Sequence, residues 1–116
     1  MSMAALSNYR FTVLSKTVAA GGQDTAEYSP AQDIVIKKIA INERAGTALN
    51  NVFIDIEIQG DKVTKQPIPA SLFTVPWSQL PDLEINLPKS VQIKFTIINN
   101  TGGALNIDIV LAWKPA

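Results

Sequence analysis

Two carboxylates in the most regular stretch of the sequence form the one catalytic arrangement that this chain offers. Asp55 and Glu57 stand two residues apart among alternating isoleucines, so in an extended strand both side chains project from the same face. Two carboxylates about 5–10 Å apart can act as acid and base on a glycosidic bond. The same spacing is also typical of the solvated face of an ordinary antiparallel strand, and we favour that interpretation.

Histidine and cysteine are both absent from the 116 residues. The chain therefore lacks the commonest general base and transition-metal ligand, and it has no thiolate nucleophile, disulfide or thiolate metal site. Oxygen ligands for Ca²⁺ remain at Asp24, Asp61, Asp82 and Glu84, but no Asp-x-Asp-x-Asp spacing connects them. We expect no enzymatic activity, no metal and no cofactor.

The charge balance excludes other classes of function. Ten basic and ten acidic residues cancel. Nucleic-acid-binding proteins normally show a basic surface, because neutralising phosphates supplies much of their affinity, so we expect no nucleic-acid partner. A net charge of zero also removes one barrier to self-association. No apolar run approaches the ~20 residues that cross a bilayer, and the first residues lack the features of a secretory signal.

The elements that position these residues are predicted to be strands. Apolar and polar residues alternate along most of the chain, and this period of two indicates β-strands with one buried face. In the first strand, Tyr9, Phe11 and Val13 share one side. Gln59-Gly60-Asp61-Lys62 predicts a tight hairpin turn. The predicted strands cover residues 9–18, 25–28, 33–42, 51–59, 72–75, 83–87, 91–97 and 105–113.

The strand at residues 33–42 contains an irregularity. Its four isoleucines change parity after Ile36. A single β-bulge at Lys37-Lys38 would return all four to the core and leave both lysines outside. The alternative is a strand buried on both faces at one end, which would enclose two adjacent lysines at a high cost in free energy.

The last two predicted strands flank Asn100-Thr101-Gly102, which has the composition of a hairpin loop with Gly102 in the left-handed region. Such a hairpin would pair Phe95 with Ile107, and the end of the fold would be a meander. It would also set Lys94 opposite Asp108. If the loop instead crosses from one sheet to the other, the arrangement is a jelly roll, and both alternatives stay open.

The fold class follows from the number and spacing of the strands. Seven or eight short strands, separated by turns every 8–12 residues and without a helical stripe, predict an antiparallel β-sandwich. We take a single jelly roll as the expected arrangement. Residues 1–8 are predicted to form a flexible N-terminal arm, and residues 9–116 form one domain. The sequon Asn99-Asn100-Thr101 is interpreted as part of a turn.

Four apolar residues fall where a monomeric sandwich does not need them. Trp77 lies in a proline-rich loop that cannot form a regular strand, and it could close one end of the sandwich, anchor an interface or stack on a sugar. Phe53, Ile98 and Val110 lie on otherwise polar strand faces, a pattern that indicates subunit contacts. The interface candidates are therefore Phe53, Trp77, Ile98 and Val110.

Two stretches also carry a family resemblance. These are the proline-rich run Gln66-Pro67-Ile68-Pro69-Ala70-Ser71-Leu72-Phe73 and the close Val91-Gln92-Ile93-Lys94-Phe95-Thr96-Ile97-Ile98-Asn99-Asn100-Thr101-Gly102-Gly103. Residues 41–113 resemble in pattern the small single jelly-roll virion proteins of bacteriophages and archaeal viruses, of the penton (vertex) or decoration type. The resemblance implies a capsid-associated structural protein without catalytic residues.

Together these observations predict a non-enzymatic structural subunit of a virion or similar symmetric assembly. Its partners would be copies of itself, closed into a ring, and other particle proteins. Its location would be the virion, assembled in the host cytoplasm. The alternative is a β-sandwich module that binds glycans or a cell surface through Trp77.

Overall fold

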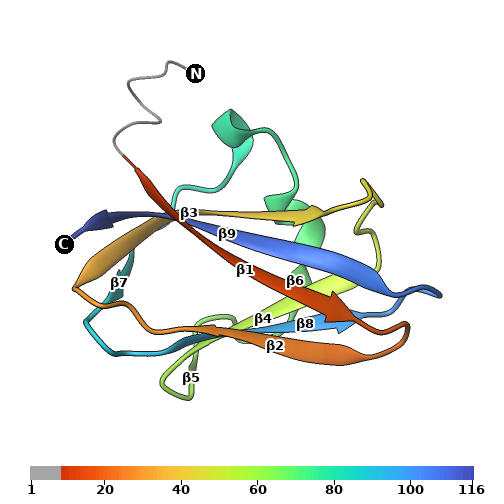
Figure 1. The fold of residues 1–116 in the computed structure, drawn as a ribbon, viewed down its shortest axis with the longest axis horizontal. Helices are drawn as coiled ribbons and strands as arrows, with labels where there is room; N and C mark the ends of the chain where they lie inside the picture. Colours follow the sequence, from red (N-terminus) through yellow and green to blue (C-terminus); the bar gives the residue numbers. More distant parts are fainter. Residues whose placement is uncertain (1–8) are drawn as a thin grey trace.

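The computed structural model describes residues 9–116, in which two antiparallel sheets pack face to face (Figure 1). The first sheet has the strand order β1-β9-β3-β7, and the second has the order β2-β8-β4-β5, with β6 paired to β4. The strands are β1 (Arg10–Val18), β2 (Gln23–Tyr28), β3 (Ile34–Glu43), β4 (Val52–Ile58), β5 (Asp61–Lys62), β6 (Ile68–Pro69), β7 (Ile85–Leu87), β8 (Ile93–Asn99) and β9 (Leu105–Pro115).

The order of strands identifies the winding as a jelly roll. The chain changes sheet from β1 to β2, β2 to β3, β3 to β4, β6 to β7, β7 to β8 and β8 to β9. This alternation between two sheets is what a jelly roll requires. The expected single jelly roll is therefore confirmed, and the alternative that stayed open, a hairpin between the last two strands, is not formed. Phe95 pairs with Ala26 and Ile56 within the second sheet, whereas Ile107 belongs to the first sheet.

The reason lies in the position of the two strands. β8 has β2 and β4 on its two sides, and β9 has β1 and β3, so each strand's hydrogen-bonding edges are both occupied. The loop between them also differs from a tight hairpin turn, because Gly102 does not have a positive φ.

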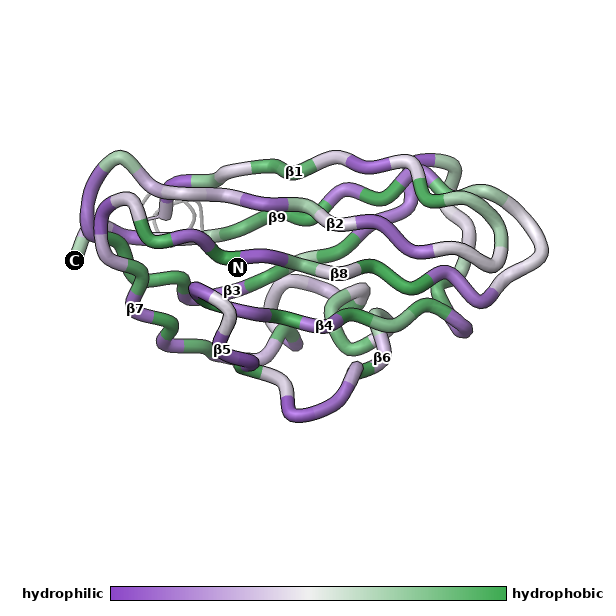
Figure 2. The backbone as a smooth tube through the Cα atoms, turned by 90° about the horizontal axis from the view of Figure 1, so that it is seen from below, coloured by the Kyte–Doolittle hydropathy of each residue, from purple (hydrophilic) through white to green (hydrophobic). Residues whose placement is uncertain are grey.

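The core lies between the sheets and follows the predicted parity. The predicted inward residues of β8 and β9 are confirmed, and Figure 2 shows the alternation of hydropathy along these strands. Val52 and Ile54 of β4 were also predicted to face inward, and both are buried. The residues buried to 1 % exposure or less include Val52, Ile54, Ile93, Phe95, Ile97, Ile107, Ile109 and Leu111.

The predicted β-bulge in β3 is confirmed. The register between β3 and β9 shifts between Ile36 and Lys38, and all four isoleucines of the strand are at most 2 % exposed. Lys37 is half-buried. Lys38 lies on the outer face as predicted, but the expectation that it is open to solvent is wrong: it is only 9 % exposed, because a loop distant in the sequence covers it.

The proline-rich region departs from the prediction at one place. Residues 72–75 do not form a strand; Ala70–Phe73 is a 3₁₀ helix, η1. Ala70 and Phe73 are both buried, and the three-residue repeat of a 3₁₀ helix brings such residues to one side. A second turn, η2, covers Trp77–Gln79. The predicted edge strand at residues 83–87 is present as β7.

The predicted turn after β4 is confirmed. Gln59 and Gly60 have φ angles of 49° and 84°, and two successive positive φ angles define the two-residue hairpin turn that suits the twist of antiparallel strands. The predicted N-terminal arm, residues 1–8, lies outside the described residues. Within residues 9–116, no helix has the length and apolarity to cross a membrane.

Candidate functional site

An apolar strip lies on the outer face of the first sheet. We define the outer strip as Tyr9, Phe11, Val13, Ala40, Trp77 and Val110. In the register of the sheet, Val110 of β9 lies between Val13 of β1 and Ala40 of β3. Phe11 and Val13 are 46 % and 56 % exposed. These two neighbours on one edge strand therefore leave large apolar surface uncovered by the described part of the chain.

The inner side of β1 explains why its apolar residues face outward. Thr12 points toward the core, and its Oγ1 accepts a hydrogen bond from Nε1 of Trp113 over 3.0 Å. A buried indole N–H needs such an acceptor. Thr12 must therefore face inward to bind Trp113. Because successive residues of a strand point to opposite faces, Phe11 and Val13 then face outward.

Trp77 covers one end of the outer strip. Its ring centroid lies 5.5 Å from that of Tyr9 and 5.8 Å from that of Phe11, both in edge-to-face geometry. The ammonium of Lys38 lies 5.7 Å from the same indole, within the range of a cation–π contact. Trp77 is half-buried. It therefore packs on the outside of the first sheet and does not close an end of the sandwich.

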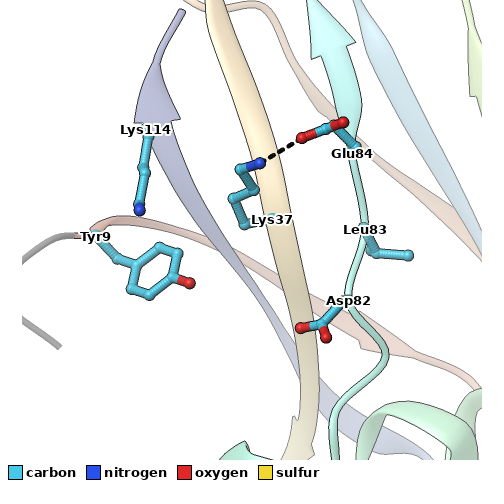
Figure 3. A pocket seen from close by; sticks show the side chains of 6 residues that line it. All are labelled: Tyr9, Lys37, Asp82, Leu83, Glu84 and Lys114. Carbon is cyan, nitrogen blue, oxygen red and sulfur yellow. Dashed lines mark hydrogen bonds and ion pairs between the residues drawn. The ribbon is translucent and has the colours of Figure 1, made fainter. Parts of the chain in front are cut away.

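A polar pocket of about 450 Å³ borders the strip (Figure 3). Lys37 reaches across it to Glu84, with 2.5 Å between Nζ and Oε1, and the hydrogen bond and charge of Lys37 lower the pKa of Glu84. The Lys114 ammonium lies 4.8 Å from the Tyr9 ring centroid. The pocket is lined by Tyr9, Lys37, Asp82, Leu83, Glu84 and Lys114.

The strip ends at a polar region on the other half of the same face. There the Asp108 carboxylate accepts a hydrogen bond from the Ser15 hydroxyl over 2.6 Å and pairs with the Arg44 guanidinium at 3.1 Å. The hydrogen bond from Arg44, followed by that from Ser15, lowers the pKa of Asp108. An apolar centre with polar groups on both sides matches the composition of protein–protein contact surfaces.

The four interface candidates from the sequence occupy two opposite faces. Trp77 and Val110 belong to the outer strip. Phe53 and Ile98 lie directly opposite each other on β4 and β8, on the outer face of the second sheet, and both are half-buried. The exposed residues of β1 were not among the predicted interface candidates. The pattern that could have identified them is the position of Tyr9, Phe11 and Val13 on one side of the strand.

The paired carboxylates are engaged in structural contacts. Asp55 accepts hydrogen bonds from Nζ of Lys62 at 2.7 Å and Oγ1 of Thr64 at 2.5 Å, and these two bonds, that of Lys62 first, lower its pKa. Glu57 pairs with Lys94 at 3.3 Å. The prediction of a solvated face is wrong for Asp55, which is 7 % exposed, because the segment after β5 folds over it.

The lowered pKa keeps Asp55 ionised near neutral pH, which is unsuited to a general acid. Across residues 9–116, no three or more acidic, histidine or cysteine side chains gather in a way that could hold a metal ion. In the described arrangement, the carboxylates of Asp55 and Glu57 are engaged by Lys62, Thr64 and Lys94.

Comparisons with known proteins identify no family. No protein-family model matches the chain, and no curated protein matches it. Among solved structures, a mitogen derived from Yersinia pseudotuberculosis is similar, with a TM-score of 0.47 and 10% identity over 89% of this chain and 85% of that chain.

Two viral structures are also similar over most of this chain. The infectious bursal disease virus VP2 subviral particle has a TM-score of 0.36 and 13% identity, and the match covers 90% of this chain and 32% of that chain. The Gx strain structure of the same virus has a TM-score of 0.30 and 13% identity, covering 92% and 32%. At these scores the likenesses carry no functional information, and the jelly-roll assignment rests on the strand order.

Proposed function

We propose that this protein is a non-enzymatic structural subunit of a virion or a similar symmetric assembly, and that it works by packing against copies of itself and other particle proteins. The observation that carries the proposal is the outer strip, in which Phe11 and Val13 remain about half exposed. Apolar patches with polar borders on soluble domains mark contact sites. A chain of zero net charge meets little electrostatic resistance to such packing.

Burying the outer strip in a subunit contact contributes favourable free energy. Fully burying one Val or Phe side chain contributes roughly 1.5–3 kcal/mol, so covering the exposed halves of Phe11 and Val13 contributes about 1 kcal/mol each. These terms are part of the free energy of a subunit contact, whose total must also offset the loss of translational and rotational freedom on association. Such a subunit would be located in the virion, and its penton, vertex or decoration role follows from the same proposal.

Size-exclusion chromatography with light scattering at low micromolar concentration tests the proposal. We expect a discrete multimer, and we expect Val13→Asp to shift it toward monomer. Val63→Asp is the matched control, because Val63 is also about half exposed, at 47 %, and follows β5 of the second sheet. A wild-type monomer, or equal effects of the two substitutions, would contradict self-association through this strip.

The alternative function, a glycan- or cell-surface-binding module using Trp77, predicts a different result. The protein would be monomeric, and its tryptophan fluorescence would change when sugars are added. The contacts of the Trp77 ring with Tyr9, Phe11 and Lys38 favour an interface role over an open stacking platform, because three neighbours already occupy positions around the ring.

A further inference from the structure

Lys38 connects the loop that carries Trp77 to the first sheet. Its ammonium donates hydrogen bonds to the main-chain oxygens of Leu80 at 3.2 Å and Trp77 at 3.4 Å, and it lies 3.1 Å from the Asp82 carboxylate. Within residues 9–116, the other hydrogen bonds of residues 76–82 are internal, and directly after this segment the main-chain N–H of Leu83 donates a hydrogen bond to the main-chain oxygen of Lys37 over 2.8 Å. The Lys38 ammonium therefore makes the polar side-chain contacts between the first sheet and the loop that carries Trp77, within the described residues.

The β-bulge in β3 creates this connection. By adding one residue at Lys37, it returns Lys38 to the outer face, opposite Ala112 of β9. On the other side of Ala112 lies Phe11 of β1. Ala112 shares the outer face with these two residues, yet it is only 1 % exposed. The Trp77 ring, which contacts both flanking side chains, fits above this row because alanine leaves room for it.

The burial of a charged group here needs a reason. Desolvating an ammonium costs several kcal/mol, and an apolar side chain of similar volume often gives equal or greater stability. Lys38 has a side-chain exposure of 11%. If the only requirement were to cover the sheet, a methionine would suffice. The ammonium also fixes where the loop lies, because its N–H groups point toward two main-chain oxygens and a carboxylate of that loop.

We infer that Lys38 is the positioning residue of the self-association surface, and that it holds Trp77 against Tyr9 and Phe11 as part of the surface that a second copy of the chain contacts. The identity of the binding partner, a second copy of the chain, rests on the proposed function. The placement of Trp77 by Lys38 is a property of the single chain and can be measured independently of assembly.

The experiment uses the full chain labelled with 5-fluorotryptophan, in which Trp77 and Trp113 give two ¹⁹F resonances, assigned with Trp77→Phe. The variant is Lys38→Met, which keeps the apolar stem and removes the donors. The matched control is Lys37→Met, the adjacent lysine that pairs with Glu84. Lys38→Arg restores a cation with several donors, and Asp82→Asn removes one partner at an exposed position.

We expect Lys38→Met to shift the Trp77 resonance and to raise the dissociation constant of the assembly at least tenfold, with a melting temperature close to that of the wild type. Lys38→Arg should recover both values, Lys37→Met should change neither, and Asp82→Asn should cause a smaller change in the same direction. An unshifted Trp77 resonance in Lys38→Met, or a shifted resonance with unchanged association, would overturn the inference. A monomeric wild type would overturn the proposed function, while the resonance would still report whether Lys38 places Trp77.

Discussion

The side-chain amide of Asn99, at the end of β8, donates a hydrogen bond to the main-chain oxygen of Val18, at the end of β1, over 3.1 Å. The same nitrogen lies 3.2 Å and 2.9 Å from the main-chain oxygens of Ala19 and Gly103. Val18 belongs to the first sheet and Asn99 to the second. One side chain therefore joins the sheets at the end where the connections β1–β2, β3–β4 and β8–β9 cross between them.

Asn99→Ala is expected to destabilise the fold by about 2–4 kcal/mol, because it leaves buried carbonyl oxygens without their donor. Asn99 is fully buried, so water cannot replace the lost bonds. Urea unfolding followed by circular dichroism measures the change. Asn100→Ala is the control, since Asn100 is exposed and its main-chain bond to Asn51 is retained. Equal stabilities of the two variants would contradict the role of Asn99.

Two phenylalanines provide a contrast between core and surface. Phe95→Ala should cost about 3–5 kcal/mol, because Phe95 is fully buried and its truncation leaves a cavity. Phe11→Ala should cost about 1 kcal/mol or less in the monomer, because Phe11 is 46 % exposed. Thermal or chemical unfolding at a concentration below that of assembly compares the two. A larger loss for Phe11 would show that the outer strip belongs to the core of the monomer.

Stability is expected to fall in acid. The pKa of Glu43 is lowered, chiefly by the hydrogen bond from the Asn106 N–H, with further bonds from Thr47 and Ala45. A carboxylate with a lowered pKa stabilises the fold fully above its ordinary value, which is 4.5 for Glu43, and this contribution disappears as pH falls through the folded value. The lowered pKa values of Asp55, Glu84 and Asp108 act in the same direction.

The free energy of unfolding should therefore be nearly constant from pH 7 to about pH 5 and should decrease below about pH 4.5. In urea titrations, Glu43→Gln should be less stable than the wild type at pH 7, and the difference should shrink at pH 3. Glu27→Gln, at an exposed position of β2, serves as the control. A difference between Glu43→Gln and the wild type that is independent of pH would contradict this account.

Two glycines should respond differently to substitution. Gly60 has a φ of 84°, a conformation that costs a residue with a Cβ about 1 kcal/mol. Gly102 has no positive φ, and an added Cβ there meets no atom within 4 Å. We expect Gly60→Ala to lower the melting temperature by several degrees and Gly102→Ala to leave it unchanged. The reverse order would show that the loop after β8 adopts a different conformation in solution.

The parts of the fold that the sequence predicts are those with a local physical cause. Alternation predicts the buried faces of β4, β8 and β9, because a strand must present every second residue to the core. The parity change after Ile36 predicts the bulge in the same way. The tight turn at Gln59-Gly60 also follows from local composition.

The errors concern contacts between distant segments. The composition of residues 100–102 suits a hairpin, but the neighbours of β8 and β9 decide the crossing. Lys38 is covered by a loop about 40 residues later, and Asp55 by the segment after β5. The candidate site was predicted in part for the same reason: Trp77 and Val110 were identified singly, but their relation to β1 depends on sheet order.

The central position of β9 has a consequence for how the chain is made. β1 and β3 have β9 between them as their shared partner, although β9 follows all the other described strands in the sequence. Until residues 105–115 emerge, the first sheet cannot form, because the edges of β1 and β3 that pair with β9 have no hydrogen-bonding partner. The nascent domain thus remains open to chaperones and to unintended strand pairing until its last described strand has been made.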